Sequence, residues 1–482
     1  MSSHVDDLRR ARADEPGASR TAGLLLAVVC ATIFFDALDL SITQIALPSI
    51  QDGLGISTSA LPWVATAYVV TYGGFLLLGG RAGDLLGARP VFLTGLAIFG
   101  AASLVCGLAG NGGVLLGARA AQGVGAALTV PTAVAMLAAA FPEGPARNRA
   151  FATFTAAAGS GFSAGLVLGG LITDGLSWRW IFLAKVPLVA VTLIAALRAV
   201  PRSRTRRRGG YDVAGALTVT AGAVLLLYGI TQAGNPAAGT AATAVPLIVA
   251  AALLAAFVFI ENRSRSPLLP LRVVRIRAVA AADAAALAVL AAPFGVSFVV
   301  TLYLQDVLHH SPMRAALTLL PGSIVSALVG RYAAPRALDR FGLRTVYTTA
   351  LVIVALGNAP LIALGPNRAD WLIVVATMVS FGVGMGLAYP AATVGGVTHT
   401  DPADHGTAAG LNNTALQIGG GIGLAAVAAA VTVGLHGQTA GAADPDVALH
   451  AVRLGALAAT LIPLAGAAIA LLGLPRRAPG TD

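Results

Sequence analysis

Long apolar stretches separated by short polar segments dominate this chain. A stretch of ~20 apolar residues can cross the hydrocarbon core of a bilayer as an α-helix. The pattern predicts about fourteen such spans. We place their centres near Phe34, Val70, Ala101, Leu128, Gly165, Ala190, Val224, Ala251, Leu290, Ser326, Val354, Ser380, Ile422 and Leu461. The chain is therefore expected to be an all-α, multi-pass membrane protein.

The arginines between the spans predict its orientation. They gather before the first span and after the even-numbered ones, as at Arg89, Arg149, Arg204 and Arg275, whereas residues 234–240 after the seventh span carry no charge. Basic residues are retained on the cytoplasmic side of a membrane. We therefore expect both termini in the cytoplasm and the protein in the cell membrane, which in a bacterium is the inner, cytoplasmic membrane.

The basic clusters also divide the chain. We expect a cytoplasmic segment over residues 1–20, a six-helix bundle over 21–200, a basic loop with two linker helices over 201–277, a second six-helix bundle over 278–475 and a cytoplasmic tail over 476–482. Together these make two six-helix bundles with two extra transmembrane helices.

A faint repeat supports the two bundles. Gly80–Arg89 follows the second span and Arg331–Arg344 follows the tenth, and each segment has an aspartate three residues before a glycine. Transporter halves that arose by duplication show this kind of internal symmetry.

Composition narrows the class of protein. Hydrophobic residues make up 57% of the chain and charged residues 11%, whereas soluble domains carry about 25% charged residues. The net charge of +10 comes from short arginine clusters between apolar segments, which argues for contact with the cytoplasmic leaflet and against a nucleic-acid partner. Lys185 is the sole lysine and lacks the glycine and hydroxyl neighbours of a P-loop. With no catalytic or metal-ligand constellation, we expect neither an enzyme nor a cofactor.

Arg119 lies within the fourth span, where a charge costs at least ~3 kcal/mol and needs a partner. Asp36 and Asp39 lie in the first span. Counting ~1.5 Å per residue from the outer surface puts Asp39 ~12 Å deep and Arg119 and Lys185 ~9 Å deep. All three share one slab, and Asp36 lies one turn further in on the face of Asp39.

A carboxylate in this slab is suited to exchanging a proton, because burial favours its neutral form and a nearby cation favours its charged form. We therefore assign Asp39, Asp36 and Arg119 to proton coupling. The alternatives are a purely structural Asp39–Arg119 salt bridge and a hydrogen-bonded, non-titrating Asp36. Asp283 begins the ninth span near the cytoplasmic face, where an interfacial role is expected.

Several motifs resemble the major facilitator superfamily, specifically its fourteen-span drug:proton antiporter branch. Arg119 with Gln122 and Gly123 matches the span-four signature, whose arginine is linked to proton coupling. Leu38–Ser41 followed by Ala46–Pro48 resembles the span-one signature, with Asp39 as its acidic residue. The resemblance covers nearly the whole chain and implies the major facilitator fold.

The Gly80–Arg89 segment resembles the family's loop between spans two and three. Asp84, Gly87 and Arg89 match its aspartate, glycine and terminal basic residue, and with Gly80 we assign them to a gating loop. The resemblance implies that Asp84 contacts the end of a neighbouring helix and keeps the outward-open state closed on the cytoplasmic side.

Lys185 stands where the family usually has asparagine. Facing the central cavity, it favours an anionic substrate; the alternative is that its ammonium extends to the outer headgroups. Gln44, Gln122, Asn413 and Gln417 are expected to line the cavity with it, or instead to join helices by hydrogen bonds.

The sequence thus predicts a secondary active transporter that exports small, partly apolar, antibiotic- or drug-like compounds by proton antiport with alternating access. Its expected partners are the substrate, protons and the lipid bilayer, and we expect a monomer. A symporter or uniporter of a small organic anion is the alternative, because Leu166 replaces the proline usual after Gly165. A non-transporting scaffold or receptor is disfavoured, since it has no need of costly charges such as Asp39 and Arg119.

Overall fold

The computed structural model describes residues 16–57, 60–141, 145–200, 212–233, 239–264, 271–365, 370–398, 400, 405–435 and 443–475, apart from a few side chains within them. The first helices are α2 (Pro16–Leu54), α3 (Trp63–Leu86), α4 (Ala88–Leu108), α5 (Gly112–Ala140), α6 (Pro145–Gly175), α7 (Trp180–Leu183) and α8 (Lys185–Ala199). The pair α9 (Val213–Ala233) and α10 (Thr240–Arg263) follows. The last part comprises α11 (Leu271–Val274), α12 (Arg277–Leu302), η1 (Tyr303–Val307), α13 (Pro312–Leu328), η2 (Val329–Ala333), α14 (Ala334–Asn358), η3 (Ala359–Ala363), α15 (Asp370–Thr377), η4 (Met378–Met385), α16 (Gly386–Val397), α17 (His405–Gly434) and α18 (Pro445–Gly473).

Helices alone form the regular structure of the described residues, as expected in lipid, where each backbone N–H and C=O must be satisfied internally. Twelve of these helical stretches are long and apolar enough to cross a membrane. The longest, Pro312–Ala363, is broken at Gly342, and the apolar part of α3 is the shorter Trp63–Leu76. The predicted all-α membrane protein is confirmed, while the count of fourteen spans and the cytoplasmic termini remain predictions.

The two repeat segments share a backbone feature. Gly87, between α3 and α4, has φ 97°, and Gly342, at the kink in α14, has φ 76°. Such positive φ values are accessible to glycine at little cost. The expected loop is mostly helical, however, because α3 continues to Leu86 and only Gly87 interrupts the two helices. The Gly80–Arg89 segment thus connects the two apolar stretches as a helix end followed by a one-residue break, and its gating role stays a prediction.

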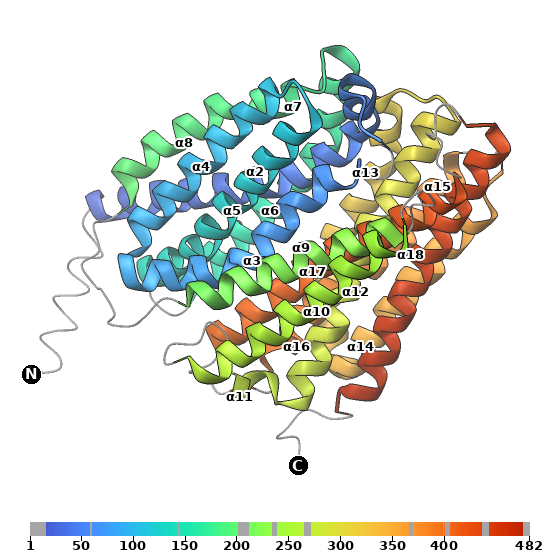
Figure 1. Ribbon diagram of the computed structural model, residues 1–482. Coiled ribbons are helices and arrows are strands. Elements are labelled where there is room, and N and C mark those ends of the chain that lie inside the picture. Colours follow the sequence, from blue (N-terminus) through green and yellow to red (C-terminus); the bar gives the residue numbers. More distant parts are fainter. Residues whose placement is uncertain are drawn as a thin grey trace, which may run out of the picture.

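The helices pack in two groups with the α9–α10 pair beside them (Figure 1). In the first group α2 packs on α6, and α5 packs on α3 and α4; in the second, α12 packs on α17 and α18. The two groups meet where α6 contacts α13 and where α3 contacts α17. Helix α9 contacts both α3 and α17, so the extra pair lies along the seam.

Small residues allow the backbones to touch, which is how helices associate tightly in lipid. A Cβ added at Gly79 of α3 would lie 2.0 Å from the carbonyl oxygen of Ala127 on α5. A Cβ at Gly419 of α17 would lie 2.1 Å from the carbonyl oxygen of Leu287 on α12. Both groups therefore depend on glycine at their tightest crossings.

The two groups are also joined at the ends that the arginine pattern predicts to face outside. Gln305 donates a hydrogen bond from Nε2 to the carbonyl oxygen of Ile45, at 3.0 Å. A Cβ at Gly170 would lie 2.8 Å from the Cα of Met313. These contacts bring α2 against η1 and α6 against α13 at that end.

We expect Gly79→Ala to lower stability by roughly 1–3 kcal/mol, because the added methyl must push the α5 backbone away. Gly117→Ala is the matched control, since a Cβ at this helical glycine meets no atom within 4 Å. The melting temperature of the purified protein in detergent should fall for Gly79→Ala and stay level or rise for Gly117→Ala. Equal melting temperatures for both variants would contradict the packing described for α3 and α5.

Candidate ion-pair site in the first helix group

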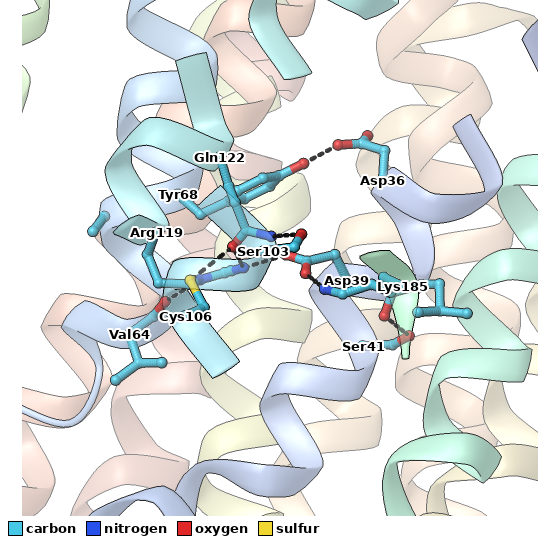
Figure 2. Close-up of polar contacts among 12 residues, drawn as sticks. Asp36, Asp39, Ser41, Val64, Tyr68, Ser103, Cys106, Arg119, Gln122 and Lys185 are labelled. Carbon is cyan, nitrogen blue, oxygen red and sulfur yellow. Dashed lines mark hydrogen bonds and ion pairs between the residues drawn. The ribbon is translucent and has the colours of Figure 1, made fainter. Parts of the chain in front are cut away.

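The carboxylate of Asp39 is the centre of a buried ion cluster (Figure 2). Its Oδ2 accepts a hydrogen bond from Nη1 of Arg119, and its Oδ1 accepts one from Nζ of Lys185. Asp39 and Arg119 are 0% exposed and Lys185 is 3% exposed. One carboxylate therefore links α2, α5 and α8, and the shared depth predicted for these residues corresponds to direct contact.

Arg119 is fixed by further polar contacts. Its Nε donates to the carbonyl oxygen of Val64, at 2.7 Å, and its Nη1 also donates to Oε1 of Gln122, at 2.9 Å. Gln122 in turn donates to Oγ of Ser103, at 2.7 Å, and accepts from Sγ of Cys106, at 3.4 Å. The amide predicted to line a substrate cavity instead orients the arginine.

Aromatic rings complete the surroundings of both cations. The Arg119 guanidinium lies 4.7 Å from the ring centroid of Tyr68, and the Lys185 ammonium lies 5.0 Å from that of Phe182 and 5.8 Å from that of Phe99. Cation–π contacts of this kind strengthen when water is excluded. The Lys185 side chain thus points into the cluster, so the structure does not show it extending to the outer headgroups.

The charges of the ion cluster do not balance, because it holds two cations and one carboxylate. Two buried cations share the single carboxylate of Asp39. Removing one partner of a buried pair is costly because the other charge stays desolvated. Asp39 is thus the residue whose loss leaves the most uncompensated charge.

Asp36 lies apart from the cluster. Its Oδ1 accepts a hydrogen bond from the Tyr68 hydroxyl, and no salt bridge joins it to a cation among the described residues. The carboxyl lines a small cavity together with Thr32, Phe99 and Thr129. Sequence spacing placed Asp36 and Asp39 on one helix face; the structure gives them different partners, with Tyr68 between Asp36 and Arg119.

The other residues predicted for the substrate cavity are dispersed. Gln44 is buried, and in the part of the chain that the structure describes neither its amide oxygen nor its amide nitrogen has a hydrogen-bond partner. Gln417 packs at the contact between α17 and α3, where a Cβ at Gly73 would lie 3.1 Å from its own Cβ. Asn413 is half-buried on α17. The structure therefore separates these three from Lys185 and Gln122, which belong to the ion cluster.

The predicted gating residues are placed only in part. Nη2 of Arg89 donates to the carbonyl oxygen of Leu197 near the end of α8, at 2.7 Å. Gly80 lies close to α5, since a Cβ there would be 3.6 Å from Pro131. Gly87 forms the break between the helices. Asp84 is in α3, but its side chain lies outside the described part, so its contact stays a prediction.

Several groups in the cluster were not anticipated, among them the Val64 carbonyl, Ser103 and Tyr68. The Val64 carbonyl cannot be read from a side-chain pattern, because any residue there offers the same acceptor. Ser103 and Tyr68 carry hydroxyls within apolar spans, where a polar side chain usually bonds across helices. Both hydroxyls are visible in the sequence, so hydrogen bonds of Ser103 and Tyr68 with neighbouring helices could have been predicted. The described residues hold no group of three or more His, Cys, Asp or Glu that could bind a metal.

These helices define a multi-pass membrane protein that carries buried charges within its spans. The family model described as Major Facilitator Superfamily matches residues 29–424. The chain belongs to this superfamily.

The relatives refine that membership. A cephamycin export protein of Amycolatopsis lactamdurans is 38% identical over 425 residues, 87% of each chain. A puromycin resistance protein of Streptomyces alboniger is 33% identical over 95% of this chain and 92% of its own length. A solved nucleoside transporter matches with a TM-score of 0.64 at 13% identity, over 93% of this chain and 99% of that one, and so shares the fold. The predicted resemblance is confirmed, and the matched proteins are antibiotic export and resistance proteins and transporters, not enzymes.

Charge balance predicts an order of stability. Asp39→Asn leaves two buried cations without a counter-ion and should cost ~3–5 kcal/mol. Lys185→Asn leaves the balanced Asp39–Arg119 pair and should cost much less. The double variant Asp39→Asn/Lys185→Asn should be more stable than Asp39→Asn alone, because one uncompensated cation has been removed.

Melting temperatures in detergent test this order. Strictly additive effects of the two substitutions would show that Lys185 and Asp39 do not share the charge balance.

Proposed function

We propose that this protein is a secondary transporter that exports small, partly apolar, antibiotic-like compounds in exchange for protons. The observation that carries the proposal is the Asp39–Arg119–Lys185 cluster, a costly set of charges buried within predominantly apolar helices. The printed functions of the matched relatives, cephamycin export and puromycin resistance, support the substrate class.

The contacts between the helix groups support alternating access. At the predicted outer end, Gln305 bonds to Ile45 and Gly170 packs on Met313. We interpret this arrangement as the state closed to the outside. In our proposal fourteen spans place both termini in the cytoplasm, and a monomer works in the cytoplasmic membrane of a bacterium, with Asp84 as part of the cytoplasmic gate.

Tyr68 connects the proton to the ion cluster in this proposal. Its hydroxyl donates to Asp36 while its ring lies against the Arg119 guanidinium. Asp39 already has two cations as partners, which compensate its negative charge. Asp36 has a single neutral donor and faces a cavity, so it is the better candidate to take up and release the proton. Protonation of Asp36 weakens the hydrogen bond that it accepts from Tyr68. The Tyr68 ring can then shift, which changes its cation–π contact with Arg119.

A transport experiment tests the proposal directly. Inverted membrane vesicles with an imposed pH gradient should accumulate puromycin or a cephamycin, and collapsing the gradient should abolish accumulation. Asp36→Asn should remove gradient-driven accumulation while gradient-independent exchange of labelled substrate persists. Asp52→Asn, at an exposed acid on the same helix, is the control and should behave as wild type.

Unchanged gradient dependence in Asp36→Asn would exclude Asp36 as the proton carrier. Movement of substrate with the proton, or without any gradient, would favour the symporter or uniporter instead. Absence of all movement for a broad substrate panel would favour a scaffold or receptor.

Lys185 governs substrate charge in this proposal. If Asp39 releases the ammonium during the cycle, the freed cation favours a substrate with a carboxylate. The cephamycins carry a carboxylate and puromycin carries an amine, so they form a matched pair of probes.

Lys185→Asn should lower cephamycin export about tenfold or more, which corresponds to the loss of one ion pair of ~1.4 kcal/mol. Puromycin export should hold or rise. An unchanged ratio of the two rates would show that Lys185 never meets the substrate.

A further inference from the structure

A second buried carboxyl group, Asp283, lies on α12 in the other helix group. The residue is 8% exposed, although it had been expected at the interface. Its Oδ1 accepts a hydrogen bond from Nδ2 of Asn412 on α17, at 2.8 Å, whereas its Oδ2 is buried and has no hydrogen-bond partner among the described residues. The proposed function makes no use of this group.

The surroundings hold the Asn412 amide against the carboxyl group. A Cβ at Gly396 of α16 would lie 2.7 Å from both Cβ and Cγ of Asn412, so only glycine leaves room for that side chain. Tyr347 of α14 faces Asp283, but its hydroxyl donates to the carbonyl oxygen of Ala282, at 3.2 Å. The carboxyl group therefore has one neutral donor and one open oxygen.

Within the described residues, no cation pairs with this carboxyl group. The titratable or charged residues on the elements packed around it are Arg277 of α12, Arg272 of α11, Arg336, Asp339, Arg340, Arg344 and Tyr347 of α14, Tyr389 of α16, His405 of α17 and, near the opposite end of α18, Asp446, His450 and Arg453. Among the described side chains, no basic nitrogen makes a salt bridge with Asp283. The His405 side chain lies outside them.

An ionised carboxylate in this place is costly, because its charge is desolvated and one oxygen lacks any donor. A neutral carboxylic acid fits better, since its carbonyl oxygen accepts from Asn412 and its hydroxyl carries the proton on the open oxygen. We propose that Asp283 and Asn412 form a second proton-binding site, separate from the Asp39 cluster and in the opposite helix group. Only its use in export rests on the proposed function; proton binding itself does not.

Infrared difference spectroscopy on the purified full-length protein in liposomes tests this site without any substrate. Raising the pH should remove a carboxylic-acid C=O band from the wild type and from Asp36→Asn. Asp283→Asn should lack that component. If this carboxylic-acid band disappears in Asp283→Asn but remains in Asp36→Asn, it belongs to the second site and not to Asp36.

Asn412→Ala provides an independent variant, should Asp283→Asn fail to fold. Removing the amide donor should shift the pH at which the Asp283 component disappears. A wild-type spectrum with no pH-dependent carboxylic-acid band, or one that is the same in Asp283→Asn, would overturn the proposal. Loss of the component on adding sodium at constant pH would assign the site to a metal cation and overturn it equally.

A transport readout separates this proposal from the proposed function. With puromycin as probe, the number of protons moved per substrate should fall in Asp283→Asn while export continues. A titrating Asp283 in a protein that exports nothing would refute the export function alone. If Asp283→Asn exports puromycin with an unchanged number of protons, and the wild type shows no pH-dependent carboxylic-acid band, the second site is refuted and the export function is not.

Discussion

The first helix group is organised by the need to neutralise charge where water is scarce. Asp39 is the one carboxylate shared by Arg119 and Lys185, and its two oxygens fix α5 and α8 against α2. The Val64 carbonyl and the Gln122 amide then orient the arginine. A helix shift that separates any of these partners leaves a desolvated charge behind. The cluster can therefore exchange partners between a few arrangements, but it cannot loosen gradually.

Tyr68 gives this rigid cluster a connection to a second carboxyl group. Its hydroxyl donates a hydrogen bond to Asp36 and its ring contacts the Arg119 guanidinium, so one side chain interacts with both groups. Asp283 has no such link, since its neighbour Tyr347 is bonded to the backbone. The two helix groups thus hold carboxyl groups in different settings: one beside a cation cluster and one beside an amide.

The all-helical, multi-span pattern and the shared level of Asp39, Arg119 and Lys185 could be predicted from the sequence, because hydrophobic length and residue counting along a helix are local properties. For this reason the sequence predicts Asp39, Arg119 and Lys185 at a similar depth, and in the structure Asp39 contacts both cations directly. Partners that depend on how helices cross could not be read. Asp36 proved to bond to Tyr68, and Asp283 proved to be covered by α14 and α17, because helix rotation and tilt decide what faces a side chain. The Gly80–Arg89 motif was recognisable, yet its helical form depends on how far α3 continues.

Gly87 and Gly342 take similar backbone conformations with positive φ at matching places in the two repeat segments. A residue with a β-carbon would be strained at either position, whereas the arginines and aliphatic residues around them have no such restriction. The internal symmetry of the chain is then clearer in this backbone angle than in the side chains around it. Two segments with few matching side chains can still turn from one helix into the next in the same way.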